Sequence, residues 1–108
     1  MLAAGTKILM SDGTEKSIEQ IKIGDKIMTK DYQEETVVKV SQEYFKGELV
    51  NYHDILCTPN QRIFIYTSEH YEDIYYDVYV LSKDLLSFEG IVYSFDTLQE
   101  KSFVSGDI

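Results

Sequence analysis

The single cysteine of this chain, Cys57, and its nearest imidazole, His53, are the first side chains to consider for chemistry. An imidazole beside a thiol can remove its proton and make it a nucleophile. The spacing of four residues would place both on one face of a strand, but about 13 Å apart at roughly 3.3 Å per residue, too far for a catalytic hydrogen bond. Cys57 stands between Leu56 and Thr58, and buried cysteines act as small hydrophobic residues. We therefore predict a structural Cys57.

An acidic cluster with one histidine, Glu69-His70-Tyr71-Glu72-Asp73, is the second candidate. Its carboxylates and imidazole could hold a divalent metal, because zinc accepts both kinds of ligand. The cluster lacks the spacing of a calcium loop, and no second cysteine–histidine pair accompanies it. We expect an exposed connector here, and neither a metal site nor a cofactor.

Length and charge limit the number of domains and the kinds of partner that the chain could have. A chain of 108 residues predicts one domain over residues 1–108. The formal net charge is −9, and nine Asp/Glu against two Lys/Arg lie from Ile63 onward. This acidic second half argues against nucleic-acid binding, which relies on Lys and Arg to neutralise phosphates. The acidic residues could keep the protein soluble, or they could form a surface that docks on a basic protein partner.

The sequence also bears on the compartment. No apolar run reaches the roughly 18 residues that a membrane helix needs, and no signal peptide stands at the start. A single cysteine forms no intrachain disulfide, which fits a reducing compartment. We expect a cytoplasmic monomer that binds neither membrane nor nucleic acid.

The elements that must position any site are β-strands, since Tyr, Phe, Val, Ile and Thr are abundant. Strands are expected over 6–10, 26–29, 35–40, 54–58, 62–66, 75–81, 91–95 and 102–104, with a strand, a bend at Gly47 and another strand over 44–50. Turns are expected at Asp12-Gly13, Gly24-Asp25 and Pro59-Asn60. Residues 17–21 predict a single helical turn, and 82–86 another with Ser82 as its cap. Eight or nine short strands indicate a sandwich or a partly closed barrel.

Residues 75–81 carry the strongest strand signal, Tyr-Tyr-Asp-Val-Tyr-Val-Leu. Alternation divides this strand into two faces, with Tyr75, Asp77 and Tyr79 on one and Tyr76, Val78 and Val80 on the other. We expect the second face to lie in the core. The first is either ordinary sheet surface or an aromatic recognition patch of the kind enriched at interfaces.

A longer pattern runs over residues 4–27 and reads A-G-T-x-I-x-M-x-D-G-x-x-K-x-I-E-x-I-x-x-G-D-x-I. Two further segments accompany it, 47–62 with Thr58-Pro59-Asn60-Gln61, and 92–104 with Val92-Tyr93-Ser94-Phe95. Together they resemble the Hint domain family, the self-processing module shared by inteins, bacterial intein-like domains and hedgehog C-terminal domains. The resemblance implies an all-β, horseshoe-shaped fold built from two pseudo-two-fold halves.

The resemblance also implies roles for particular positions. The family's nucleophile, Cys or Ser, falls on Met1, and the Thr that helps to hold the scissile carbonyl falls on Thr58. The His that protonates the leaving nitrogen falls on Gln61. The family's late Asp and His fall on Ser94 and Lys101. Its closing His-Asn pair has no counterpart among residues 1–108, which end in Gly106-Asp107-Ile108.

These substitutions remove groups that an N-to-S acyl shift needs. A thioether has no ionisable proton and cannot attack as a thiolate does. Glutamine donates hydrogen bonds but does not exchange a proton near neutral pH as histidine does. We therefore expect an intein-like self-processing domain that is inactive as written, with flanking host-protein segments as its partners if processing occurs.

Two alternatives stay open. One is a working variant in which the catalytic residues stand at shifted positions. The other is a non-catalytic binding or spacer module, which would act through the acidic second half or the tyrosine-rich strand.

Overall fold

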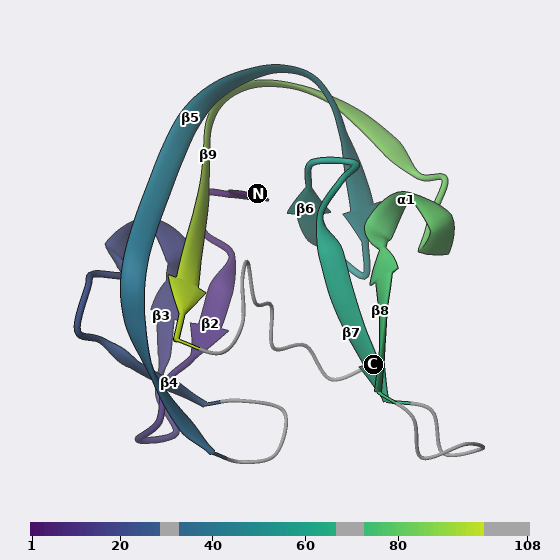
Figure 1. Cartoon of the computed structure of the whole chain (residues 1–108). Helices are drawn as coiled ribbons and strands as arrows, with labels where there is room; N and C mark the ends of the chain where they lie inside the picture. The colour runs from purple at the N-terminus through teal and green to yellow at the C-terminus, as the bar shows by residue number, and fades with distance from the viewer. Residues whose placement is uncertain (29–32, 67–72, 99–108) are drawn as a thin grey trace.

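The computed structural model describes residues 1–28, 33–66 and 73–98, most of which lie in β-strands (Figure 1). In chain order the elements are β1 (Leu2–Ala3), β2 (Lys7–Leu9), β3 (Glu15–Ser17), the 3-10 turn η1 (Ile18–Gln20), β4 (Lys26–Met28), β5 (Glu34–Tyr52), β6 (Ile55–Cys57), β7 (Arg62–Tyr66), β8 (Asp73–Asp77), the helix α1 (Val78–Leu81) and β9 (Leu85–Thr97). The expected all-β horseshoe is confirmed. The strand expected over 102–104 lies outside the described residues. So do residues 69–72 of the expected acidic connector, whereas its last residue, Asp73, begins β8.

Strands β5 and β9 pair along an arch that joins two lobes (Figure 1). Their antiparallel register runs from Val37↔Thr97 to Val50↔Leu85. Each lobe adds a hairpin, β2–β3 on one side and β7–β8 on the other, so the two halves resemble each other. The strands expected within 35–50 are one continuous strand of 19 residues.

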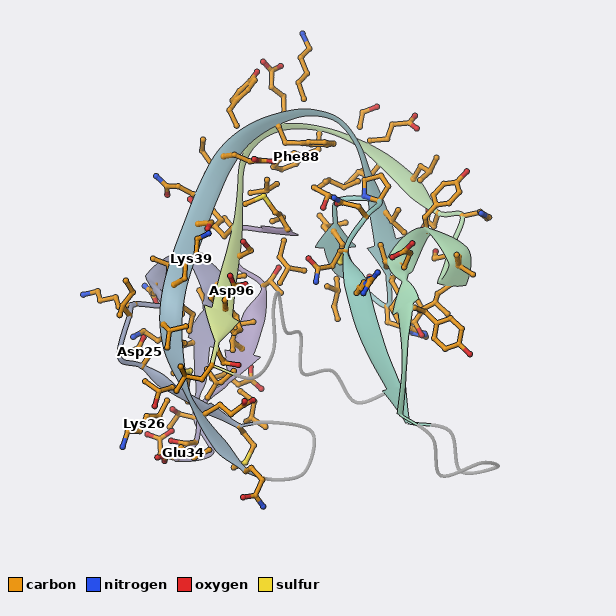
Figure 2. The ribbon with its side chains drawn as sticks, viewed as in Figure 1. Asp25, Lys26, Glu34, Lys39, Phe88 and Asp96 are labelled. Carbon is orange, nitrogen blue, oxygen red and sulfur yellow. The ribbon has the colours of Figure 1, made fainter. Side chains whose placement is uncertain are left out.

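Two phenylalanine–glycine pairs lie in the arch. Gly47 lies opposite Phe88, and Phe45 lies opposite Gly90. A Cβ at Gly47 would come within 3.1 Å of the Phe45 ring, and a Cβ at Gly90 within 3.1 Å of the Phe88 ring. The Phe88 side chain lies under the arch, on its concave side (Figure 2). The two strands expected on either side of a bend at Gly47 are one strand that curves through the arch, because aromatic rings cover the glycines and the ladder continues past them.

The first lobe follows its local sequence signals. Gly13 in the β2–β3 turn has a φ of +86°, and Gly24 before β4 has a φ of +96°. Both are left-handed conformations that glycine adopts without strain. The single helical turn expected over 17–21 is confirmed as η1, and its Ile18 and the following Ile21 are both buried.

The second lobe is built on β6, which pairs with β5 and with β1. The turn between β5 and β6 holds His53 and Asp54, whose φ values are +48° and +67°. His53 therefore lies in a tight turn and not on the strand that carries Cys57. Cys57 itself is fully buried, so the prediction of a structural cysteine is confirmed.

The strand expected over 75–81 ends at Asp77, and α1 follows as one helical turn. The Val78 nitrogen donates to the carbonyl of Gln61 at 2.7 Å, which leads the chain out of the β7–β8 ladder. The turn buries Val78 but leaves Val80 66% exposed. The expectation that Val78 and Val80 share one buried face is therefore wrong.

Ser82 ends α1 and does not begin another turn. Its nitrogen donates to the Val78 carbonyl at 3.1 Å, and its hydroxyl donates to the Asn51 carbonyl at 2.9 Å. The helical turn expected over 82–86 is wrong, because these contacts hold the chain extended and β9 begins at Leu85. No helix in the described ranges is long and apolar enough to cross a membrane.

Two hydrophobic clusters hold the fold together. The larger one draws buried residues from both lobes: Leu2, Ile8, Met10, Ile18, Ile21, Ile27, Val37, Val50, Tyr52, Cys57, Ile63, Val78 and Phe95. The smaller one consists of Ala3, Leu49 and Val92, with Met1, Phe45, Leu56 and Phe88 packed against it. The second cluster places the side chain of residue 1 among apolar groups, next to the candidate site.

Candidate functional site

Residue 1 lies between the two lobes, under the arch of β5 and β9 (Figure 1). The short strand β1 that follows it is held on both sides, by β6 and by β9. Leu2 pairs with Cys57 on one side and with Tyr93 on the other. Since Leu2 is also buried, the backbone leading to Met1 has a fixed position.

The same registers identify the neighbours of Met1. The pairing Leu2↔Cys57, continued by one residue, sets Met1 against Thr58. The pairings Leu2↔Tyr93 and Ala3↔Val92, continued in the same way, set Met1 against Ser94. Thr58, which directly follows β6, and Ser94 of β9 thus flank residue 1.

The Thr58–Gln61 segment is a turn that ends β6 and leads into β7. The Gln61 nitrogen donates to the Thr58 carbonyl at 3.0 Å, which closes this turn around Pro59. The expected Pro59-Asn60 turn is confirmed. Thr58 and Gln61 are buried, with 5% and 2% of their surface exposed, although both side chains are polar. Buried polar side chains need hydrogen-bond partners, and both find one at residue 1.

The nitrogen of Met1 donates two hydrogen bonds, to Thr58 Oγ1 at 2.8 Å and to Gln61 Oε1 at 2.6 Å. The carbonyl of Met1 accepts from the Thr58 amide at 2.9 Å. The three positions that the resemblance singled out in the first 62 residues therefore meet at one nitrogen. In a processing reaction at residue 1, this is the nitrogen that leaves.

Two further contacts orient the acceptors. The Thr58 hydroxyl donates to Asn60 Oδ1 at 2.7 Å, so its lone pairs are available to the Met1 nitrogen. Gln61 Nε2 donates to the Arg62 carbonyl at 3.0 Å, which turns Oε1 towards Met1. Asn60 was not predicted as a site residue. The signal for it was its place in the four-residue turn that links Thr58 to Gln61.

The electrostatics of the site follow from burial. Burial lowers the pKa of the Met1 α-amino group from its usual value of 8.0, and the nearby Cys57 and Glu43 only partly oppose this. Burial also raises the pKa of the Cys57 thiol to about 12, despite the adjacent amino group. The site thus favours neutral groups, and the only thiol of the chain is not a nucleophile at neutral pH.

The remaining predicted positions are less informative. Ser94 lies in β9, where it pairs with Ser41 of β5 as well as flanking residue 1. Lys101 lies outside the described residues. Within residues 1–28, 33–66 and 73–98, no three His, Cys, Asp or Glu side chains gather where they could hold a metal ion.

Comparisons with known proteins agree with this geometry. Residues 1–62, more than half of the chain, match the family model described as Hom_end-associated Hint, an intein-related Hint domain associated with homing endonucleases. The catalytic subunit of the V-type proton ATPase from Candida tropicalis is 48% identical over 40 residues. That alignment covers 37% of this chain and 4% of the relative, so the chain spans only a small part of that protein's length. From the horseshoe fold, the contacts at residue 1 and the family match, we conclude that this chain belongs to the Hom_end-associated Hint family.

Proposed function

We propose that this chain is an intein-like self-processing domain in which positions 1 and 61 do not supply the chemistry of the acyl shift. The observation that carries the proposal is the 2.6 Å hydrogen bond from the Met1 nitrogen to Gln61 Oε1. Position 61 faces the nitrogen that would leave, and it presents an acceptor there. A processing site needs an acid at that point, because the departing nitrogen must gain a proton.

The acyl shift also needs a nucleophile at residue 1. In that reaction a thiolate attacks the preceding carbonyl carbon, a thioester bond forms, the peptide C–N bond breaks and the nitrogen takes up a proton. The thioether of Met1 has no proton to lose and cannot form the thioester. Cys57 does not substitute for it, because its thiol is fully buried and its pKa is raised to about 12.

The packing of Met1 supports a structural role for its side chain. Met1 is packed against the cluster of Ala3, Leu49 and Val92, and so are Phe45 and Phe88. Flexible methionine side chains fill irregular apolar gaps well. A large apolar side chain therefore suits the space at position 1.

A cleavage assay tests this proposal. The chain would carry a short reporter peptide before residue 1, and release would be followed by mass spectrometry with and without dithiothreitol. We compare the parent with Met1→Cys and with the double variant Met1→Cys/Gln61→His. Met1→Ala/Gln61→His is the matched control, because it has the acid but no nucleophile.

We expect no release from the parent or the control, and thiol-dependent release from the double variant. Release from the parent itself would contradict the proposal and favour a working variant with shifted catalytic residues. Circular dichroism on each protein separates lost chemistry from lost folding.

A non-catalytic binding role is the second candidate, favoured by exposed apolar side chains in the second half. Tyr79 is 45% exposed and Val80 66%, and the nearby Leu85 and Leu86 at the start of β9 are 41% and 48% exposed. If the folded double variant releases nothing, this second candidate becomes the better explanation. A partner would then lose affinity when Val80 and Leu86 are replaced by serine.

A further inference from the structure

The long strand β5 has one edge that is paired throughout and one edge that is open along its middle part. On the paired edge, β9 follows β5 from Val37 to Val50. On the other edge, β4 pairs with β5 as far as Thr36, and β6 pairs with it from Val50 onward. Between Val38 and Leu49 no residue of the described ranges pairs with this second edge. An open edge of this length can accept a further strand from another chain.

The register of β5 shows which backbone groups point to the open edge. The Asn51 nitrogen donates to the carbonyl of Asp84, just before β9, so the backbone groups of Asn51 point to the paired edge. Successive residues of an antiparallel strand direct these groups to opposite edges, and the pairing with β9 has no register shift between residues 39 and 50. The residues whose N–H and C=O groups point to the open edge are therefore the even-numbered ones: Val40, Gln42, Tyr44, Lys46 and Glu48.

The open edge is electrically neutral, although the chain as a whole is acidic. The charged residues between positions 38 and 49 are Lys39, Glu43, Lys46 and Glu48, two of each sign, whereas the formal net charge of the chain is −9. Two acidic copies of a protein repel each other. A neutral stretch is therefore a favourable place for two copies of this chain to meet.

We propose that two copies of this chain pair antiparallel along the open edge of β5, around a two-fold axis at Ser41. Lys39 and Glu43 are both exposed, and each stands two residues from Ser41. The two-fold axis therefore sets Lys39 of each copy opposite Glu43 of the other. Charges on an edge strand usually prevent pairing, but here opposite charges meet. An axis at Glu43 or at Lys46 would instead set two like charges against each other, which is destabilising.

Apolar side chains on the same stretch support this register. Val40 is 41% exposed and Tyr44 is 59% exposed. In the proposed pairing, Val40 lies diagonally across from Val40 and Tyr44 of the second copy, within reach of the aromatic ring. The paired segment, residues 38–44, is short compared with interfaces of about 1,200–2,000 Å² that hold stable complexes. The dimer should therefore form and dissociate with concentration. It is an alternative to the monomer expected from the sequence, and it does not depend on the proposed function.

Sedimentation equilibrium of the 108-residue chain tests the association, at concentrations from about 5 to about 500 μM. Lys39→Glu sets glutamate against glutamate twice in the dimer. The double variant Lys39→Glu/Glu43→Lys exchanges the two charges and restores both attractive pairs. Lys46→Glu is the matched control, because it makes the same change of charge on the same strand but outside the paired segment.

We expect the mass of the parent to rise from one chain towards two as the concentration increases. Lys39→Glu should raise the dissociation constant about tenfold or more, because it replaces two attractions by two repulsions. The exchanged variant should return to within about threefold of the parent. A parent that stays monomeric would overturn the proposal. So would an equal effect of Lys39→Glu and Lys46→Glu, or a failure of the exchanged variant to recover.

A disulfide at the two-fold axis tests the register. In the proposed pairing the two Ser41 residues form a pair without mutual hydrogen bonds, whose Cα atoms lie about 4.5 Å apart, within the range that a disulfide can span. Ser41→Cys should therefore give a covalent dimer on mild oxidation, seen on a non-reducing gel, while the buried Cys57 stays free. Ser87→Cys, at an exposed position on β9, is the control. Equal rates of cross-linking for the two variants would overturn the proposed axis and, with it, the proposal.

Discussion

Thr58 holds Met1 by two reciprocal hydrogen bonds: its amide donates to the Met1 carbonyl at 2.9 Å, and its hydroxyl accepts from the Met1 nitrogen at 2.8 Å. Both bonds use backbone atoms of residue 1, so they do not depend on its side chain. The site can therefore keep the position of residue 1 constant while the chemistry of its side chain changes. This separation allows the effects of Met1 and of its contacts to be measured one at a time.

Replacement of Met1 by serine should destabilise the domain without moving its backbone. The change removes a partly buried apolar side chain from the cluster that includes Phe45 and Phe88, which we expect to cost about 1–2 kcal/mol. Met1→Leu, of similar volume, should cost less than about 1 kcal/mol. Urea unfolding followed by fluorescence measures both changes. Equal stabilities for the serine and leucine variants would show that the contact in the cluster has no energetic weight.

The pH dependence of stability should carry the signature of the Met1 amine. Burial lowers the pKa of this group below 8.0 in the folded state, so the unfolded chain binds more protons in the window between the lowered pKa and 8.0. The free energy of unfolding therefore rises with pH through this window. Urea midpoints at pH 6, 7, 8 and 9 would reveal the rise. An Nα-acetylated protein is the control and should lack this component.

The local features of the first lobe could be predicted from sequence, because neighbouring residues determine them. Asp12-Gly13 and Gly24-Asp25 form their turns, and Ile18 with Ile21 marks the helical turn between them. The continuity of β5 could not be predicted in this way. Past Gly47, its ladder continues through pairing with Phe88 of β9, which lies far along the chain.

At the end of β8, a contact from a distant part of the chain ends a strand that the local sequence favours. The alternation over residues 75–81 favours a strand, but the Gln61 carbonyl binds the Val78 nitrogen and a helical turn begins there. In the site, Thr58 and Gln61 were identified through the family resemblance. Asn60 was not, because its contribution is a side-chain contact to Thr58, and only its place in the turn between Thr58 and Gln61 indicated it.

Cys57 should resist alkylation in the folded protein. It has no exposed surface, and burial raises the pKa of its thiol to about 12, so almost no thiolate is present at pH 8. Iodoacetamide should modify it only as fast as the domain unfolds, whereas the urea-unfolded chain should react like a free cysteine. Mass spectrometry over time measures both rates. Modification of the native protein at the unfolded rate would show that the thiol is accessible.

A methyl group at Gly47 should lower the stability of the domain, because it would contact the Phe45 ring. A Cβ there would lie 3.1 Å from the end of the Phe45 ring, and this ring is packed against the cluster of Ala3, Leu49 and Val92. Gly47→Ala should therefore destabilise the domain by about 1 kcal/mol, because the ring must shift within its packing. In a Phe45→Leu background the penalty should fall, since the shorter side chain leaves room for the methyl group.

The comparison forms a double-mutant cycle, measured by urea unfolding of the parent, the two single variants and the double variant. Gly90→Ala with Phe88→Leu forms the corresponding cycle on β9, where the Cβ distance to the ring is also 3.1 Å. Because Gly90 has a φ of +159°, Gly90→Ala also strains the backbone, and only the coupling term of this cycle reports on the ring. Glu48→Ala, at an exposed position next to Gly47, is the control and should change stability little. Additive effects in both cycles would mean that the rings do not occupy the space beside the glycines. Coupling in both would show that two aromatic rings, placed alike on β5 and β9, shape the arch that holds residue 1 between the lobes.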